Sequence, residues 1–249
     1  MKAGINVTHQ FAVVAHDVDR YASGRHDHRE AQLLYAVRGV VSVTTDEGTW
    51  VVPPSRAVWL PPHVEHETAS RARVQFRSLL IDTSELHNLP DECMVVEVTP
   101  LLRELILKLA TLAQHDGTQD AIEAVVNLIL LELSFRPDPA LSLPTPKHPG
   151  LAKLCERLRN DPAVELSVQK AAASLNMSRS TLMRTFQRET GMSFGRWRQQ
   201  ARILYALPLL AEGRSILDVA LECGYDSPSA FSAMFHRSLG RPPSAYFRQ

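Results

Sequence analysis

Apolar residues form short runs, rich in β-branched and aromatic side chains, from Phe11 to about Val98. The runs at 31–43, 49–52, 58–60 and 74–81 are separated by residues that favour turns, of which Asp46-Glu47-Gly48 is the clearest example. Runs bounded in this way predict β-strands, and a strand that returns after a short turn predicts a hairpin. Many short strands in succession indicate a β-sandwich or a small barrel.

Beyond Pro100 the apolar residues change to helical spacing. Two successive segments carry stripes that step by three and four positions, namely Leu102, Leu105, Leu109, Leu112 and then Ile122, Val125, Ile129, Leu133. Such a stripe either packs within its own domain or meets a partner, and both interpretations stand here. Because the two helices come just before a change in composition, we expect residues 99–135 to be a helical dimerisation segment.

Residues 136–150 separate these helices from the rest of the chain. Five prolines fall in this segment, namely Pro137, Pro139, Pro144, Pro146 and Pro149. Proline fixes φ and removes a backbone donor, so we expect an extended, semi-rigid linker without helix.

The segment 151–249 contains an internal repeat with an offset of 49 positions. The matched pairs are Ala171 with Ala220, Ser178 with Ser227, Leu182 with Phe231, Phe186 with Phe235, Gly191 with Gly240, and Trp197 with Tyr246. A constant offset over this length indicates two copies of one supersecondary unit.

Each copy is expected to be two short helices joined by a tight turn. In the first copy, Ser178 is placed to cap the second helix and Gly191 to end it. That helix would bury residues four positions apart and turn a polar, cationic face outwards, as a helix that enters the DNA major groove does. The candidate DNA contacts of the first copy are Ser178, Arg179, Ser180, Met183, Arg184 and Gln187.

The second copy repeats this pattern with less positive charge. Gly224-Tyr225 is expected to form its turn, Ser227 its cap, and Phe231 and Phe235 its buried pair. The candidate DNA contacts are Ser227, Ser229, Ala230, Ser232, Ala233 and His236. Because no arginine is among them, we expect phosphate and thymine-methyl contacts here rather than recognition of guanine.

Charge divides the chain into two halves. The formal net charge is +0, yet residues 150–249 carry 14 Lys and Arg against 8 Asp and Glu, and residues 1–149 carry 13 against 19. A basic half beside an acidic half is typical of a chain in which one half meets a polyanion. Three widely spaced cysteines form no disulfide framework, and no long apolar run indicates a signal peptide or a membrane span. We therefore expect a cytoplasmic protein with no membrane association.

Residues 216–246, from Ile216-Leu-Asp-Val-Ala to Pro-Ser-Ala-Tyr246, resemble the signature of the AraC/XylS family of transcription regulators. The first copy also fits, through Leu182, Arg184, Phe186, Gly191 and Arg202. The resemblance covers residues 151–249 and implies two helix-turn-helix subdomains, joined by a long helix, that contact two successive segments of the major groove. Pro208, inside the expected joining helix over 194–212, departs from the pattern and is expected to kink that helix or to mark its restart.

Residues 1–135 resemble, more weakly, a cupin sensor domain. The stretches 24–39 and 61–66 are similar to the two cupin motifs and contain His26, His28, Gln32 and His66. In a strand, His26 and His28 share one face because side chains alternate, and Gln32 lies on the same face if the strand is unbroken. His66, on a returning strand, would complete the cluster. Neutral imidazoles grouped in this way suit a divalent metal such as zinc.

Two departures from the cupin motifs leave the metal open. Gln32 stands where metal-binding cupins place a carboxylate, and His63 replaces the glycine of the second motif. The alternative is an effector pocket without a metal. Its candidate residues are His26, His28, Gln32, Arg38, Trp50, Trp59 and His66, and the candidate metal ligands are His26, His28 and His66.

These observations together predict an α+β chain of two domains. A cupin-like β-barrel sensor over 1–98 is followed by the dimerisation segment 99–135, the linker 136–150, and an all-α DNA-binding domain over 151–249. The expected function is sequence-specific, effector-responsive regulation of transcription, with double-stranded DNA, a small-molecule effector, a second copy of the chain and RNA polymerase as partners. The alternative is a metal-dependent cupin enzyme with a helical assembly tail; Arg179 and Arg184 argue against it, and the sequence offers no catalytic set.

Overall fold

The chain is described by a computed structural model that covers residues 4–8, 11–84, 86–115 and 117–248. It divides into two compact units, the first formed by Met1–Thr45 with Trp50–Ser142 and the second by Asp46–Thr49 with Leu143–Gln249. Within the described ranges, no helix combines the length and the apolar character that crossing a membrane requires.

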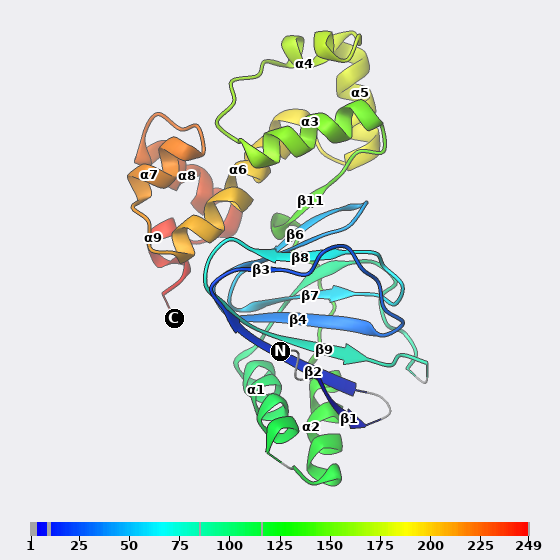
Figure 1. The fold of residues 1–249 in the computed structure, drawn as a ribbon. Helices are drawn as coiled ribbons and strands as arrows, with labels where there is room; N and C mark the ends of the chain where they lie inside the picture. Colours follow the sequence, from blue (N-terminus) through cyan, green and yellow to red (C-terminus); the bar gives the residue numbers. More distant parts are fainter. Residues whose placement is uncertain (1–3, 9–10, 85, 116, 249) are drawn as a thin grey trace. The chain divides into compact units, whose positions relative to one another are not determined.

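Antiparallel strands in two sheets build the β-domain (Figure 1). The six-stranded sheet has the order β1 (Gly4–Thr8), β2 (Phe11–Val18), β9 (Val74–Ile81), β4 (Ala31–Arg38), β7 (Arg56–Leu60), β10 (Met94–Glu97). The five-stranded sheet has the order β11 (Ser142–Pro144), β6 (Gly48–Val52), β5 (Val41–Thr44), β8 (Glu67–Ser70), β3 (Tyr21–Ala22). The predicted cupin-like β-domain is confirmed.

The apolar run at 31–43 is two strands in different sheets, β4 and β5. The chain leaves one sheet for the other at Gly39, whose φ of +79° lies in the left-handed region. A Cβ at this position would lie 2.5 Å from the carbonyl oxygen of Arg73. Only glycine fits this conformation and this close approach, so the break depends on that residue.

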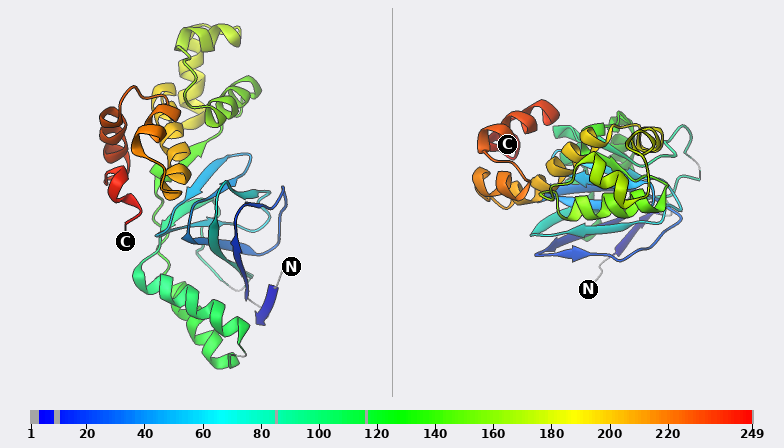
Figure 2. Two further views of the ribbon diagram at one scale, coloured as in Figure 1. Left: turned by 60° about the vertical axis from the view of Figure 1, so that its left-hand side comes forward. Right: turned by 90° about the horizontal axis from the view of Figure 1, so that it is seen from above.

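Helices α1 (Pro100–Gln114) and α2 (Gln119–Glu132) lie side by side against the six-stranded sheet (Figures 1 and 2). Their apolar stripes enter one core with that sheet: Leu102, Leu109, Ile122 and Ile129 are buried in it, and Leu105, Leu112, Val125 and Leu133 pack against it partly buried. Of the two interpretations of the stripes, packing within the domain is therefore the one that the structure supports.

The proline-rich segment is not the uninterrupted extended linker that the sequence predicted. It contains the 3-10 turn η1 (Pro139–Leu141) and the strand β11, and helix α3 begins at Pro149. Leu141 and Leu143 are buried. Proline is well tolerated in the first turn of a helix, where its missing N–H has no intrahelical partner in any case, so two of the five prolines start helical structure instead of preventing it.

The rest of the chain is helical, as predicted. Its helices are α3 (Pro149–Asn160), α4 (Val168–Ser174), α5 (Arg179–Thr190), α6 (Phe194–Ala211), α7 (Ile216–Glu222), α8 (Pro228–Leu239) and α9 (Pro243–Tyr246). The joining helix α6 continues through Pro208, which stands in its last turn, so the helix does not restart there. A proline this close to the end interrupts only the final backbone bonds.

Candidate nucleic-acid interface and effector site

The first helix-turn-helix consists of α4 and α5. The hydroxyl of Ser178 accepts a hydrogen bond from the backbone N–H of Thr181 at 3.1 Å, and Gly191 ends α5 in the left-handed conformation. Leu182 and Phe186 are fully buried, and Phe186 meets Trp197 of α6 edge to face. These contacts fix the inner side of α5, which leaves its opposite side in solvent.

The residues predicted to contact DNA in this unit lie on that outer side. All six are exposed, namely Ser178, Arg179, Ser180, Met183, Arg184 and Gln187. Within the described part of the chain, neither Arg179 nor Arg184 has an ion-pair partner. The exposed side of α5 therefore carries two cations that no acidic side chain of the described residues neutralises.

The second helix-turn-helix, α7 and α8, has the same construction. Ser227 accepts a hydrogen bond from the N–H of Ala230 at 3.2 Å, Gly240 ends α8 with φ of +72°, and Phe231 and Phe235 are fully buried. Of the predicted contact residues, Ser229, Ala230, Ala233 and His236 are exposed, and Ser227 and Ser232 are half-buried. The side chains on this face are mostly small and uncharged, and no arginine is among the predicted contacts.

The offset between the two units is not constant. Helices α4 and α7 match at 48 positions, with the same order of buried and exposed residues, whereas α5 and α8 match at 49. Ala220 therefore corresponds to Ala172 and not, as predicted, to Ala171. The left-handed turn residues Asn176 and Gly224 also match at 48, and the second unit has one residue more between its turn and its cap.

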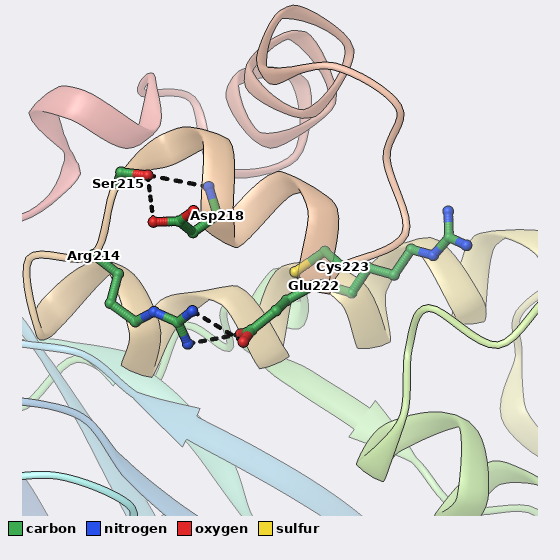
Figure 3. A network of polar contacts seen from close by, with 6 residues as sticks. Arg214, Ser215, Asp218, Glu222 and Cys223 are labelled. Carbon is green, nitrogen blue, oxygen red and sulfur yellow. Dashed lines mark hydrogen bonds and ion pairs between the residues drawn. The ribbon is translucent and has the colours of Figure 1, made fainter.

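Polar contacts fix the supporting helix α7 at both ends (Figure 3). At its start, the hydroxyl of Ser215 accepts from the N–H of Asp218 at 3.1 Å and donates to the carboxylate of Asp218 at 2.7 Å. Arg214 makes a two-pronged ion pair with Glu222 at 2.8 and 2.9 Å. The pair is partly exposed, so solvent screens it and its main effect is to orient the helix.

Three histidines come together in the β-domain. His26 and His66 form a backbone bridge with N–O distances of 2.9 and 2.8 Å, and His28 completes a group whose ligand atoms all lie within 4.8 Å of one another. His26 is exposed, His28 half-buried and His66 fully buried, so the group runs from the surface inwards. The condition of an unbroken strand from His26 through Gln32 is not met, because residues 27–30 are irregular and β4 begins at Ala31.

Backbone carbonyls set the orientation of all three rings. Each Nδ1 lies beside a carbonyl oxygen, at 3.0 Å for His26, 2.6 Å for His28 and 2.8 Å for His66. An Nδ1 that faces a carbonyl must carry the proton, so in the neutral rings Nε2 holds the free lone pair. Burial lowers the pKa of His66 and favours its neutral form, and its buried Nε2 has no hydrogen-bond partner among the described residues.

Gln32 adds a fourth group to this cluster. Its amide nitrogen donates to the hydroxyl of Ser78 at 2.5 Å, and its Oε1 lies 3.4 Å from Nε2 of His28. In the neutral tautomer both facing atoms are acceptors, which a cation between them would reconcile. Three imidazole nitrogens and an amide oxygen fit a weakly held divalent metal, although no carboxylate is among them. The sequence did not indicate Ser78, because its approach depends on the pairing of β4 with β9.

The other residues predicted for the effector pocket lie elsewhere. Trp59 pairs with Leu33 on the face of the sheet opposite to Gln32. It meets Phe135 edge to face and donates to the carbonyl of Pro90 at 2.9 Å. It belongs to the core beneath α1 and α2. Arg38 is exposed at the end of β4, and Trp50 is buried in β6. The sequence predicted that side chains alternate along these strands, but it did not show which face of the sheet points into the barrel.

An exposed apolar strip on α2 also escaped the sequence analysis. Leu128 and Leu131 are 50% and 84% exposed, and Ala124 lies on the same side one turn earlier. The spacing of four and three positions was present in the sequence, but a continuous apolar helix does not reveal which of its stripes is buried. This strip is distinct from the stripe that packs in the core.

Both the β-domain and the helical part of the chain match known protein families. Residues 9–141 match the AraC-like ligand binding domain, and residues 171–249 match a helix-turn-helix domain. The HTH-type transcriptional regulator NimR of Escherichia coli (strain K12) is 34% identical over 228 residues, which cover 92% of this chain and 83% of that protein. The virulence regulon transcriptional activator VirF of Yersinia enterocolitica is 28% identical over 228 residues, covering 90% and 82%.

Solved structures show a more distant likeness. The crystal structure of unsaturated fatty acid-bound ToxT from Vibrio cholerae shares 15% sequence identity with this chain, with a TM-score of 0.39, over 99% of this chain and 97% of that one. The sequence relatives are named as regulators of transcription and not as enzymes.

Proposed function

This chain belongs to the AraC family of transcription regulators, and on that basis we propose that it binds DNA as a homodimer whose arrangement on DNA changes when a small molecule binds in the β-domain. The chain is a DNA-binding regulator with a ligand-binding domain, and the alternative of a cupin enzyme finds no support among its relatives.

The observation that carries the DNA-binding proposal is the pair of capped helices α5 and α8, each with its predicted contact residues at the surface. Arg179 and Arg184 would form hydrogen bonds to the edges of guanines, and Gln187 to the edge of an adenine. The second unit would contribute phosphate contacts and apolar contacts to thymine, through Ser227, Ser229, Ala230, Ser232, Ala233 and His236.

Selection of bound fragments from random DNA by the full chain tests this proposal. We expect two half-sites, one for each chain of the dimer. Each half-site should have two parts about 10 base pairs apart, one for α5 and one for α8 in successive major-groove segments. Failure to enrich any motif, with binding that is equal for all sequences, would contradict sequence-specific recognition.

We place the effector site at the group formed by His26, His28, Gln32 and His66. A divalent metal held by the three histidines, with Gln32 as a neutral fourth ligand, would give an anionic group of the effector an anchor. Because the amide adds no negative charge, we expect the metal to be weakly bound and removable by a chelator.

Elemental analysis of untagged protein before and after chelation, together with effector-dependent DNA binding of His26→Ala and His66→Ala, tests this site. Both substitutions should abolish the effector response and leave DNA binding in place. A metal-free protein whose response survives both substitutions would remove the site.

The homodimer would form through the outer strip of α2, that is Ala124, Leu128 and Leu131. Large exposed apolar side chains in a row commonly mark an interface. Sedimentation velocity of Leu131→Glu should show a shift from dimer towards monomer. Leu217→Glu, at an exposed leucine of α7, is the matched control and should stay dimeric; equal behaviour of the two variants would exclude the strip.

A regulator that acts on a promoter must share a compartment with the chromosome and with RNA polymerase. We therefore propose the cytoplasm as its location and RNA polymerase as a further partner. Recruitment of purified polymerase to the selected DNA, with and without the regulator, tests the second statement.

A further inference from the structure

A pocket of about 480 Å³ lies in the second unit between α6 and α8. Three arginines line it, Arg198 and Arg202 from α6 and Arg237 from α8, together with Gln199 and with Tyr225 from the turn before α8. None of its lining residues is acidic. The pocket therefore gathers positive charge that the predicted contact residues of α8 lack.

Neutral groups hold two of these arginines in place. Arg198 donates from its two terminal nitrogens to the carbonyls of Leu166 and Val164, at 2.6 and 2.7 Å. Arg202 donates from Nε to the carbonyl of Pro162 at 3.1 Å, and its guanidinium lies 5.1 Å from the centre of the Tyr225 ring. Carbonyls and an aromatic ring orient a guanidinium without neutralising its charge. Burial, and then the charge of Arg202, lower the pKa of Arg198, as expected for a cation with no anion near it.

Arg237 is different, because it is exposed and has no ion-pair partner within the described residues. It stands on α8 one turn after Ala233 and two turns after Ala230, and both alanines also line the pocket. These two alanines are among the residues that we expect to face DNA. Since their side chains are small, the pocket stays open on that face.

We propose that this pocket holds a phosphate of the DNA backbone, with Arg237 as its direct contact and Arg198 and Arg202 as fixed positive charges behind it. The proposal rests on the proposed DNA-binding function and extends it. A guanidinium binds phosphate through paired, charge-assisted hydrogen bonds, and two cations already oriented by the protein lose little side-chain entropy when the anion arrives. The pocket would fix the position of the second unit on DNA, while the bases are read elsewhere.

Binding of the full chain to a duplex from the selection tests the proposal, with methylphosphonate in place of one backbone phosphate at a time. Arg237→Gln should weaken binding about tenfold, the lower end for a charge-assisted bond, and reduce the salt dependence by about one phosphate. The wild-type chain should lose affinity at one particular neutral position, and Arg237→Gln should be insensitive there. Arg20→Gln, which removes the same charge from an exposed site in the β-domain, is the matched control and should bind DNA like wild type.

Three outcomes would overturn the proposal, and they are distinguishable. If Arg237→Gln binds the duplex like wild type and keeps every methylphosphonate effect, the pocket does not contact the backbone. If inorganic phosphate binds the free protein, and Arg237→Gln abolishes that binding but leaves DNA binding unchanged, the pocket serves a free anion. If the wild-type chain binds no duplex at all, the proposed function itself fails, and this inference fails with it.

Discussion

In both helix-turn-helix units the second helix begins at a serine cap, ends at a left-handed glycine, and buries two side chains four positions apart. Their exposed sides have little in common. At an offset of 49 positions, Arg184 in the first unit corresponds to Ala233 in the second, and Arg179 corresponds to Pro228. The buried positions keep the unit folded and are repeated closely, whereas the exposed ones are free to serve different contacts.

The two units also differ in where their positively charged side chains lie. The first unit carries its cations on the reading helix itself, at Arg179 and Arg184. The second surrounds its reading helix with Arg198 and Arg202 from the neighbouring helix α6 and with Arg237 at the far end of α8. We therefore propose different roles for the two units, namely base recognition in the first and positioning on the DNA backbone in the second.

The largest expected effect tests the shared packing. Phe186→Ala and Phe235→Ala each remove a fully buried ring and should each cost about 3–5 kcal/mol of stability in their own unit. Hydrogen exchange measured peptide by peptide resolves the two units and should show the loss confined to α4–α5 or to α7–α8. A variant with unchanged protection would contradict the equivalence of the two cores.

The next effect tests the difference between the surfaces. Arg184→Ala should cost about 1–3 kcal/mol of binding and relax the preference at one base pair, because a guanidinium that grips guanine discriminates against other bases. His236→Ala on the outer face of α8 is the comparison and should change base preference less. Titration against the selected duplex and single-base variants measures both. An equal loss of affinity on every sequence would show that Arg184 contacts a phosphate, and the two units would then not differ in base recognition.

Local signals in the sequence sufficed for the caps and the buried pairs. Ser178 and Gly191 mark the ends of α5 through their own backbone preferences, and Leu182 and Phe186 follow helical spacing, so none of these predictions needed a partner in space. The register of the repeat failed between Gly224 and Ser227, because an extra residue in a turn leaves both flanking patterns intact.

Features that depend on tertiary placement could not be predicted from the sequence. Trp59 and Gln32 alternate correctly along their strands, but the sequence does not say which face the helices cover. The histidine group was predicted because two separate segments resemble the cupin motifs, whereas Ser78 belongs to neither segment and reaches Gln32 only through strand pairing. Arg198 and Arg202 reach one pocket with Arg237 only when α6, the loop between α3 and α4, and α8 are assembled.

A smaller effect concerns the two turns. Asn176 and Gly224 both have positive φ, +53° and +74°. A Cβ in the left-handed conformation costs about 1–2 kcal/mol, which Gly224→Ala newly incurs, whereas Asn176 already carries a Cβ and its alanine variant loses only the preference of asparagine for this conformation. Gly224→Ala should cost more, because its Cβ would lie 2.9 Å from the Cα of Ala163. Thermal unfolding of the two variants compares their losses of stability. If Gly224→Ala is the less destabilising of the two, the loop between α3 and α4 moves away from the new Cβ at little cost.

The smallest effect separates the two caps. Ser178→Ala and Ser227→Ala each remove the acceptor for one backbone N–H at the start of a reading helix, at a cost of about 1 kcal/mol. Ser178 also hydrogen-bonds the hydroxyls of Ser180 and Thr181, at 3.0 and 2.9 Å, so its loss disturbs two further side chains and should be the more costly. Threonine at either position keeps the hydroxyl and should restore most of the stability. If the hydroxyl also contacts DNA, the alanine variant should weaken binding by more than its loss of stability explains, and threonine should restore that binding. Unfolding and DNA titration on the same four variants therefore distinguish a cap that only supports its helix from one that also contacts the backbone.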